Sequence, residues 1–373
     1  MPLANVLVTG GAGFIGSHLV DALVDKGHAV TVLDNLTPQV HPQKPAYLNR
    51  DATYRFSDVR DKGVLKELLA DSEIVYHLAA AVGVGQSMYQ VEDYVAANTM
   101  ATATLLQTVL ETKRDLHRLV VASSMSIYGE GSYRCPHCGL VDPGIRTEEA
   151  LKRHNWEPKC PSCGKDVDPI PTAESKPLAP TSIYAITKRD QEEMCLTVGR
   201  AYGIPTVALR FFNVYGPRQQ LSNPYTGVCA IFQSRIQNGR PPVIFEDGSQ
   251  TRDFVSVHDI VQALLLASER REAAYSAINV GTGRPTSIRG VAELLLRLYG
   301  KSLPLQIENT YRAGDVRHCY ADISRAEKLL GYKPRVPLEE GLQSFIEWSR
   351  AHPAEDHLEE AHKELSSRGL VGG

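Results

Sequence analysis

The segment TGGAGFIG at residues 9–16 constrains the fold most, because its glycines recur at a fixed spacing directly after an apolar run. That run, NVLVT, predicts a buried strand, and the helical spacing of the apolar residues after it predicts a helix. Gly10 permits the tight turn, Gly13 lets the backbone approach a ligand, and Gly16 lets helix and strand pack closely. A strand–turn–helix unit of this kind holds the pyrophosphate of a dinucleotide at the helix N-terminus.

Short β-branched runs alternate with helical patterns along most of the 373 residues. This alternation indicates βαβ units and a parallel sheet that helices cover on both faces. Later strands are predicted to end at Asp34, Asp58, Ala79, Ser124 and Asn213. The sequence therefore predicts an α/β fold with a Rossmann-type, doubly wound parallel sheet at residues 1–212. We expect a smaller α+β substrate domain at 213–350, and a polar, helical tail with a flexible end at 351–373.

The acidic residue at the end of the second predicted strand selects the cofactor. Asp34 lies 18 residues beyond Gly16, where a carboxylate accepts hydrogen bonds from the adenosine ribose hydroxyls. The same carboxylate repels a 2′-phosphate, and the segment DNLTPQ supplies no Arg or Lys to bind one. We therefore expect NAD rather than NADP.

Charge and hydropathy exclude several classes of partner. The formal net charge of −3 argues against a broad basic surface for nucleic acid or anionic membranes. No apolar run approaches the length that spans a bilayer. The N-terminal segment has no basic stretch followed by an apolar one, so no secretory signal is expected. These features predict a cytoplasmic protein with neither nucleic-acid nor membrane partners.

A Tyr-x-x-x-Lys motif supplies candidate acid–base chemistry. Tyr184 and Lys188 lie 4 residues apart, so on a helix they share one face. A phenol with an ordinary pKa of about 10 is a poor base at neutral pH. The neighbouring ammonium and the positive nicotinamide ring of NAD favour the phenolate, which makes Tyr184 a base for an alcohol proton. Ser124, at the exit of the fifth predicted strand, can hydrogen-bond the same substrate oxygen. These three are the predicted catalytic residues.

Four of the 7 cysteines form two Cys-x-x-Cys pairs between Ser124 and Tyr184, a segment 60 positions long. Four thiolates satisfy tetrahedral zinc and leave no open position, so the metal is expected to be structural. The insert that carries them, at about residues 133–172, is too short to build a hydrophobic core, which zinc would replace. The predicted ligands are Cys135, Cys138, Cys160 and Cys163, with His137 or His154 in place of one cysteine as the minor alternative.

Taken together, the motifs resemble those of a known family. TGGAGFIG, HLAA, SSMSIYGEG, YAITK, RFFNVYGPRQ, DGSQTRDFVSVHD, NVGTG and RAGDVRH resemble the motifs of extended short-chain dehydrogenases/reductases, in the nucleotide-sugar epimerase and dehydratase branch, over residues 3–350. The resemblance implies that NAD is bound by Gly10, Gly13, Phe14, Ile15, Gly16, Asp34, Asn35, Asp58, Val59, Leu78, Ala79, Ala80, Asn98, Tyr184, Lys188 and Phe211. It implies that a nucleotide sugar is bound by Ser87, Ser124, Ser126, Asn213, Arg252, Arg312 and Asp315. It also implies a homodimer formed through two long helices, here residues 94–112 and 184–202.

The same resemblance implies one opening step, in which Tyr184 takes the proton of the sugar 4-hydroxyl while hydride passes from carbon 4 to NAD. A 4,6-dehydratase or a decarboxylase of the family has a carboxyl group directly after the catalytic residue, where this chain has Met125 and Ser126. Neither side chain moves protons as a carboxyl group does. We therefore predict a nucleotide-sugar 4-epimerase, in which hydride returns to the opposite face of the ketone. A net 4-keto reductase stays open, because it uses the same three residues.

The cysteine-bearing insert suggests a substrate, and it also raises a second class of function. Its position resembles that in a subgroup of dTDP-L-rhamnose 4-epimerases, which implies a dTDP-6-deoxy sugar as substrate. The rival class is a non-enzymatic adaptor that uses a zinc ribbon on a Rossmann scaffold to bind nucleic acid or protein. The intact Ser124, Tyr184 and Lys188 and the mixed charges of the insert oppose that reading.

Overall fold

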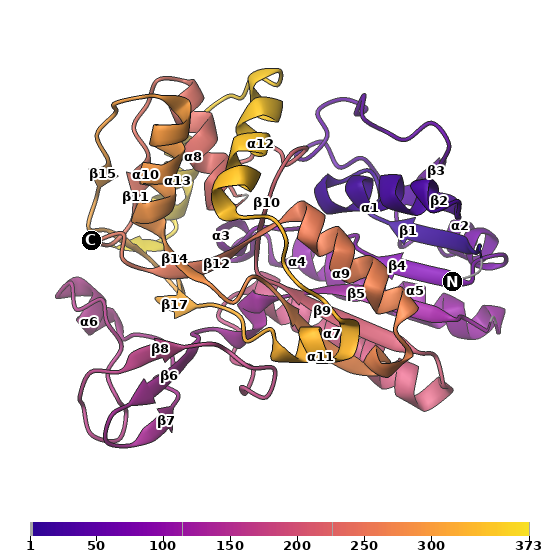
Figure 1. Cartoon of the computed structure of the whole chain (residues 1–373), viewed down its shortest axis with the longest axis horizontal. Helices are drawn as coiled ribbons and strands as arrows, with labels where there is room; N and C mark the ends of the chain where they lie inside the picture. The colour runs from indigo at the N-terminus through magenta and orange to yellow at the C-terminus, as the bar shows by residue number, and fades with distance from the viewer. Residues whose placement is uncertain (1–2, 114, 226, 373) are drawn as a thin grey trace.

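The computed structural model describes residues 3–113, 115–225 and 227–372. Met1, Pro2, Arg114, Thr226 and Gly373 are not among them, so the predicted limits at residues 1 and 373 fall outside the described residues. Figure 1 shows a sheet with helices packed around it, a smaller lobe at the upper left and a separate small unit at the lower left.

The core of the protein is a seven-stranded parallel sheet with the order β13-β9-β5-β4-β1-β2-β3. Its strands are β1 (Asn5–Thr9), β2 (Ala29–Asp34), β3 (Thr53–Phe56), β4 (Ile74–His77), β5 (Arg118–Ser124), β9 (Thr206–Phe211) and β13 (Ser276–Val280). The order reverses between β1 and β4, and ligands of doubly wound sheets bind at the carboxyl ends of the strands at such a point. The predicted Rossmann-type sheet is confirmed.

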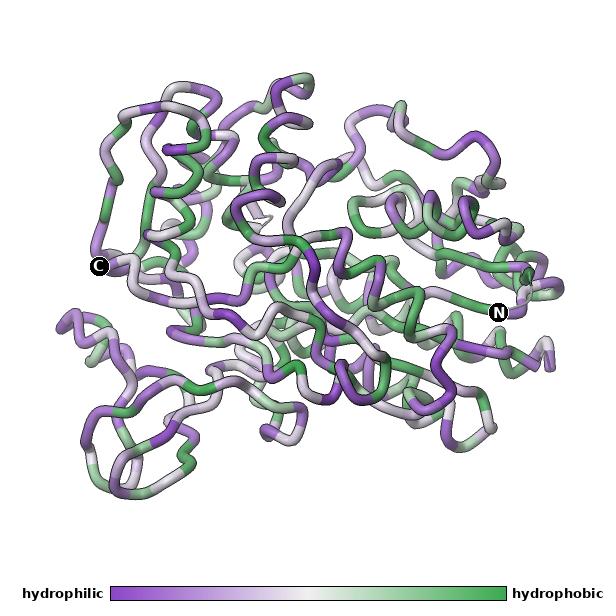
Figure 2. Tube along the Cα trace, viewed as in Figure 1, coloured by the Kyte–Doolittle hydropathy of each residue, from purple (hydrophilic) through white to green (hydrophobic). Residues whose placement is uncertain are grey.

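Helices cover both faces of the sheet, as the apolar strands predict. One face packs against α1 (Phe14–Asp25), α9 (Val257–Glu269) and α11 (Ser324–Leu330). The other packs against α2 (Lys62–Leu69), α5 (Ala101–Thr112) and α7 (Ile183–Tyr202). Figure 2 shows hydrophobic stretches running through the central strands between these helices. Within the described residues, no helix combines the length and the apolar character needed to cross a membrane.

The predicted helix at residues 94–112 begins earlier and changes pitch. After α3 (Val84–Ser87), α4 (Val91–Tyr94) continues into a π-helix (Val95–Met100) and then into α5. Asn98, in the π-helix, accepts the N–H of Ala81 at 2.7 Å and donates to the Ala81 carbonyl at 3.1 Å. The wide turn therefore carries a side chain that holds the loop after β4, and such turns are frequent at functional sites.

Beyond residue 213 the chain builds the smaller lobe. One sheet contains β10 (Asn213–Tyr215), β12 (Thr251–Ser256), β14 (Pro285–Ser287) and β17 (His318–Cys319), and another pairs β11 (Val243–Ile244) with β15 (Gln306–Ile307). Helices α8 (Val228–Gln237), α10 (Ile288–Tyr299) and α12 (Leu338–Arg350) share one apolar core. A 3-10 turn (Arg271–Ala273) precedes β13, which returns to the main sheet beside β9. The predicted domain boundary at residue 212 stays a prediction, because β13, which lies beyond it in the sequence, belongs to the main sheet.

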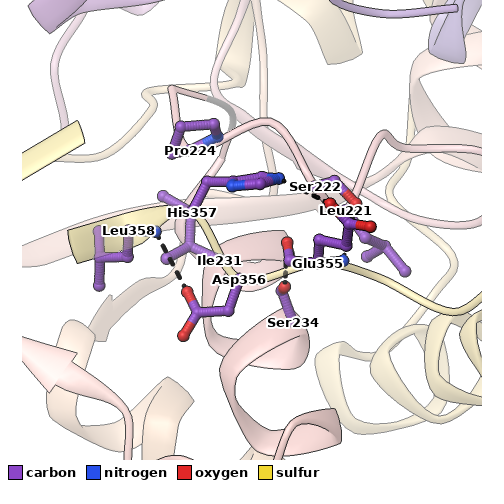
Figure 3. A pocket seen from close by; sticks show the side chains of 9 residues that line it. All are labelled: Leu221, Ser222, Pro224, Ile231, Ser234, Glu355, Asp356, His357 and Leu358. Atoms are coloured by element: carbon purple, nitrogen blue, oxygen red, sulfur yellow. Dashed lines mark hydrogen bonds and ion pairs between the residues drawn. The ribbon is translucent and has the colours of Figure 1, made fainter. Parts of the chain in front are cut away.

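The polar tail folds back onto the smaller lobe. Helix α13 (Leu358–Ser367) is followed by β18 (Val371–Gly372), which pairs with β16 (Tyr311–Arg312). Glu355, ahead of α13, donates its N–H to Ser222 and accepts from the Ser234 hydroxyl (Figure 3). The cavity at this junction has a volume of about 10 Å³, room for one water molecule. Where the sequence predicts a flexible end, residues 371–372 form a strand, because the backbone of β16 offers them partners.

The cysteine-bearing insert forms its own small sheet at the lower left of Figure 1. The sheet has the order β7-β6-β8, with β6 (Ser132–Cys135), β7 (Gly139–Val141) and β8 (Asp168–Ile170), and the insert also contains α6 (Glu148–Lys152). Its buried apolar cluster consists of Tyr133, Cys135, Cys160 and Val167. Two of these four are predicted metal ligands, so apolar burial alone gives the insert little stability.

Candidate active site

The glycine-rich turn brings β1, α1 and the loop after β4 into close contact. Gly10 has a φ of +72°, and a Cβ there would lie 2.7 Å from the Ala79 nitrogen. A Cβ at Gly16 would lie 2.1 Å from the Gly10 carbonyl oxygen. Helix α1 starts after Gly13 with no side-chain cap and no acidic residue in its first turn. Its first N–H groups are therefore suited to binding an anion such as a pyrophosphate.

Asp34 ends β2 beside this turn. Its Oδ2 accepts the Ala12 N–H at 3.0 Å, and its Oδ1 accepts the Leu36 N–H at 2.9 Å. These bonds fix the carboxylate at the carboxyl edge of the sheet, and each oxygen keeps a lone pair for a further donor. This arrangement fits an adenosine ribose that donates through its hydroxyls.

The other predicted cofactor residues near Asp34 are held within the protein. Asp58 forms two contacts of 2.9 Å with the Arg60 guanidinium, and Asn35 Nδ2 lies 3.5 Å from the same carboxylate. The hydrogen bond from Arg60 is the main reason that the pKa of Asp58 is lowered. Val59 is buried. Both carboxylate oxygens of Asp58 therefore accept hydrogen bonds from Arg60.

The remaining predicted cofactor residues differ in accessibility. Phe14, Ile15, Leu78, Ala79 and Ala80 are partly exposed, and Phe211 is buried at the end of β9. Asn98 is fully buried, and its side chain bonds only to the Ala81 backbone and to Thr187 among the described residues. Asn98 therefore fixes the loop that carries Ala79 and Ala80.

Ser124 and Tyr184 meet at the carboxyl end of β5. Ser124 begins a 3-10 turn (Met125–Tyr128), and its Oγ accepts both the N–H and the hydroxyl of Ser126, at 3.2 and 2.9 Å. Burial raises the pKa of Tyr184, and the Ser124 side chain lies close enough to the phenol to work against that rise. The structure thus brings together two predicted catalytic residues that lie 60 positions apart.

Lys188 lies one helical turn beyond Tyr184 on α7 and is 3% exposed. Its Nζ donates to Gln191 Oε1 at 2.7 Å, and Gln191 Nε2 donates to Thr102 Oγ1 at 2.9 Å. Burial is the main cause that lowers the pKa of Lys188 to about 7. The charge of this amine therefore depends on pH near neutrality.

A polar network behind Lys188 was not predicted. His77 is 1% exposed; its Nδ1 lies 2.8 Å from Thr9 Oγ1, and its Nε2 lies 2.9 Å from Thr102 Oγ1. Burial lowers the pKa of His77 to about 3, so its ring is neutral at ordinary pH. The spacing of Lys188 and Gln191 on one helix face signals their contact. No local pattern relates Gln191 to His77, which is 114 positions away.

Ser87, predicted to line the sugar pocket, supports the start of α7. It is fully buried, and its hydroxyl donates to the Val84 carbonyl at 2.7 Å. Its Oγ accepts the backbone N–H of Tyr184 at 3.0 Å. Ser182, the N-cap of α7, accepts the N–H of Ala185. Two serines therefore satisfy N–H groups at the first turn of α7.

The predicted substrate residues of the smaller lobe gather around Asp315. Its Oδ1 accepts from Arg252 at 3.0 Å and its Oδ2 from Arg312 at 2.8 Å. Burial opposes ionisation, but the charges of Arg312 and Arg252 outweigh it and lower the pKa of Asp315 to about 2. At the start of β10, the buried Asn213 Oδ1 has no hydrogen-bond partner among the described residues. Two guanidinium groups and an unpaired amide oxygen suit a diphosphate with hydroxyl groups nearby.

The four predicted metal ligands also meet. The sulfur atoms of Cys135, Cys138, Cys160 and Cys163 all lie within 4.8 Å of one another. Cys135 Sγ and Cys163 Sγ are 3.6 Å apart, and zinc with Zn–S bonds of about 2.3 Å holds its sulfurs about 3.8 Å apart. The donor set therefore fits one zinc ion. Neither alternative histidine joins this group: His137 contacts Lys165, and His154 stacks on Trp156.

Oxidation of an alcohol by a nicotinamide needs a base close to the cofactor, and the carboxyl edge of this sheet carries groups suited to both. Fold and site together define an extended short-chain dehydrogenase/reductase. Residues 6–154 and 160–281 match the sequence profile of the NAD dependent epimerase/dehydratase family. The chain belongs to this family.

Characterised relatives match nearly the whole chain. The dTDP-L-rhamnose 4-epimerase of Burkholderia thailandensis is 35% identical over 348 residues, which is 92% of this chain and 94% of that protein. The UDP-glucose 4-epimerase of Thermotoga maritima, solved with UDP-glucose, has a TM-score of 0.76 and 32% identity, covering 93% of this chain and 99% of that one. The UDP-glucuronic acid 4-epimerase of Bacillus cereus, solved with UDP-glucuronic acid and NAD, has a TM-score of 0.76 and 29% identity at the same coverage.

Proposed function

We propose that this protein is an NAD-dependent nucleotide-sugar 4-epimerase. The observation that carries the proposal is the meeting of Ser124 and Tyr184 at the carboxyl edge of the sheet, with Lys188 one turn along the same helix. The glycine-rich turn and Asp34 lie at that same edge and suit NAD. Similarity to 4-epimerases over more than nine-tenths of the chain supports the same reaction.

In the proposed mechanism Tyr184 takes the proton of the sugar 4-hydroxyl and later returns it. NAD would be held by the glycine-rich turn and Asp34, and it would supply the acceptor and donor for the hydride of carbon 4. Ser124, whose side chain lies beside the phenol, would hydrogen-bond the reacting oxygen and so position it for Tyr184. Lys188 favours the phenolate while it carries its charge. The Arg252 and Arg312 guanidiniums bind the diphosphate, which lets the sugar turn while its nucleotide stays held.

Local chemistry favours epimerisation over elimination or decarboxylation. Met125 cannot transfer a proton, and the Ser126 hydroxyl donates to Ser124. The next carboxylate along the chain, Glu130, accepts from the Tyr133 hydroxyl and from the backbone N–H groups of Arg317 and His318. Glu130 is therefore occupied in the structure and gives no free acid or base.

For the substrate, we propose a dTDP-linked 6-deoxy sugar. The support is the similarity to the Burkholderia dTDP-L-rhamnose 4-epimerase along nearly the whole of both chains. The UDP-sugar 4-epimerases that share the fold make UDP sugars the alternative to test.

The insert is proposed to bind one structural zinc ion. Cys135, Cys138, Cys160 and Cys163 would hold it, and four thiolates leave no coordination position for a substrate. Zinc would then reinforce the small buried cluster of the insert. None of the 7 cysteines, all of which are described, forms a disulfide. Free thiols of this kind suit a reducing compartment, and we propose the cytoplasm.

A homodimer through α5 and α7 is also proposed. A groove of about 400 Å³ lies between these helices. Its lining is Ala103, Leu106, Gln107, Leu110, Glu193, Met194, Thr197 and Val198. Because the groove between α5 and α7 is mostly apolar, it suits the same two helices of a second copy. The two copies would then form a four-helix contact. Light scattering of the protein, with Leu106→Glu as the disrupting variant, tests this contact.

The decisive experiment for the reaction is incubation with dTDP-L-rhamnose and UDP-glucose in heavy water, followed by NMR. Epimerisation inverts carbon 4 without deuterium at carbon 5. Deuterium at carbon 5, or a product that has lost water, would instead establish the dehydratase reaction. A 4-keto product that forms only in proportion to added NAD would establish the net 4-keto reductase, which here runs in its oxidising direction.

A further inference from the structure

The insert is fastened to the segment that carries the predicted diphosphate residues. Leu151 and Trp156 of the insert form a buried apolar cluster with Tyr311, the neighbour of Arg312 in β16. The segment that leaves the insert after β8 also contacts the smaller lobe, since the N–H of Thr172 donates to the Tyr320 carbonyl. The zinc-binding unit thus packs on the smaller lobe and not only on the loop that it interrupts.

Arg146, from the insert, makes the first polar link. Its Nη1 and Nη2 form a paired contact with Glu246 at 2.9 and 2.8 Å, and Nη2 also donates to the Asp315 carbonyl at 2.9 Å. The Arg146 and Glu246 side chains are 4% and 2% exposed. A guanidinium this buried has a fixed position, and so has the carbonyl of Asp315 that it binds.

Arg317 makes the second link. Its side chain is 1% exposed and binds Glu157 of the insert at 2.5 Å, together with Glu246 and Asp247 at 2.8 Å. Glu157 also lies 3.0 Å from His318 Nε2. We call Arg146, Glu157, Glu246, Asp247 and Arg317 the Arg317 cluster. Each of its two arginines and three carboxylates contacts at least one group of opposite charge, and the carboxylates are in excess by one.

The segment that the cluster holds also holds the arginine pair. Arg252 donates to the carbonyls of Val316 and Arg317 at 2.6 and 3.0 Å and to Asp315 Oδ1. Arg312 donates to Asp315 Oδ2. Residues 315–318 therefore lie between the insert on one side and Arg252 and Arg312 on the other. A shift of this segment would move both guanidiniums.

We propose that Arg146 and Glu157 are positioning residues for the substrate diphosphate: they hold residues 315–318, and through them Arg252 and Arg312, in the geometry that binds it. This inference rests on the proposed function, since it takes Arg252 and Arg312 as the diphosphate-binding pair. It gives the zinc-binding insert a role in substrate affinity without any contact to the sugar. Neither residue is expected to affect NAD binding, because their polar contacts go to residues 246 and 315–318 and not to the glycine-rich turn.

The variants are Arg146→Met and Glu157→Gln in the full-length protein. Each leaves its partner with a counter-charge, since Glu246 keeps Arg317 and Arg317 keeps Glu246 and Asp247. The matched control is Lys152→Ala, which removes a 60% exposed charge of the same insert. Calorimetric titration with dTDP and with UDP gives Kd, and steady-state kinetics separates KM from kcat. Bound NAD and zinc are measured on each protein.

We expect Kd and KM to rise by about tenfold in both variants while kcat stays within about twofold. NAD and zinc content should match wild type, and Lys152→Ala should change nothing. Folded variants with unchanged Kd and KM would overturn the inference, as would a fall in kcat alone. If Arg146→Met does not fold, Arg146→Lys, which keeps the charge but loses the paired contact, decides together with Glu157→Gln. Wild-type protein that binds neither nucleotide and converts no nucleotide sugar would instead overturn the proposed function.

Discussion

The backbone N–H of Tyr184 donates to Ser87 Oγ at 3.0 Å, across 97 positions of sequence. Ser87 closes α3, and the loop before α3 follows β4 at the edge where the cofactor residues lie. One hydrogen bond therefore fixes the start of α7 relative to that loop. Ser87, which the motif pattern assigns to the sugar pocket, binds in the structure the backbone of Tyr184, the proposed base.

Ser87→Ala removes this acceptor and leaves a buried N–H unpaired, which costs about 1–3 kcal/mol of unfolding free energy. We expect kcat to fall more than KM rises, because Tyr184 shifts relative to the substrate oxygen. Urea unfolding and steady-state kinetics measure the two effects. Thr104→Ala is the control, since that hydroxyl donates to the Met100 carbonyl within its own helix. Equal kinetics for the two variants would remove the positioning role.

Tyr184→Phe removes the phenol oxygen and keeps the ring, which packs edge-on against Tyr94 at 6.5 Å. Turnover should fall by about 10²–10⁴-fold, the usual contribution of a positioned acid–base group. Bound NAD and the Kd for dTDP should stay at the wild-type level, because neither depends on that oxygen. The measurement is conversion of the nucleotide sugar by NMR alongside cofactor content. Intact conversion in this variant would falsify the proposed mechanism.

Lys188→Met tests the lowered pKa of Lys188, which is about 7 against an ordinary value of 10.5. Between these values the unfolded chain binds the proton and the folded protein does not, so unfolding free energy rises with pH. Below pH 7 both states bind it and the slope vanishes. Relative to Lys188→Met, wild type should gain unfolding free energy from pH 7 to 9, on the order of 1 kcal/mol per pH unit. Urea unfolding at several pH values checks this, with Lys152→Met as the exposed control. Parallel curves for wild type and Lys188→Met would contradict it.

Cys160→Ser tests the zinc proposal. Metal analysis should find one zinc per chain in wild type and a large loss in the variant, with a lower Tm because the insert core contains Cys160. His137→Ala should keep its zinc, since His137 lies outside the sulfur group and contacts Lys165. Zinc content and Tm that are the same in Cys160→Ser and wild type would end the proposal.

Local sequence patterns predicted those helices and strands whose limits are set by residues within the element itself. The strand predicted from NVLVT is β1, and the strand ends predicted at Asp34 and Ser124 are the ends of β2 and β5. In these elements the apolar periodicity and the end signals lie in one short stretch. The cysteine group was also predictable, because each Cys-x-x-Cys turn is local and tetrahedral geometry relates the two.

Features that depend on distant partners were not predictable in this way. The π-helix at residues 95–100 depends on Asn98 binding the loop after β4, and β13 joins the main sheet although it follows the smaller lobe. The charges of the insert were visible, but not that Arg146 and Glu157 pair with Glu246 and Arg317. The local pattern of charges does not distinguish a solvated charged surface from a buried ion pair. The difference depends on the oppositely charged residue, which here comes from a distant part of the sequence.

The Arg317 cluster also sets an order for assembly on the ribosome. Cys135 to Cys163, and the strands between which they lie, emerge well before Glu246 and Arg317 are synthesised. The insert must therefore hold its shape before these partners exist, at a stage when the nascent chain is open to proteases and aggregation. A metal ion captured early would supply that shape, so cells short of zinc should accumulate less of the full-length protein even where its mRNA is unchanged.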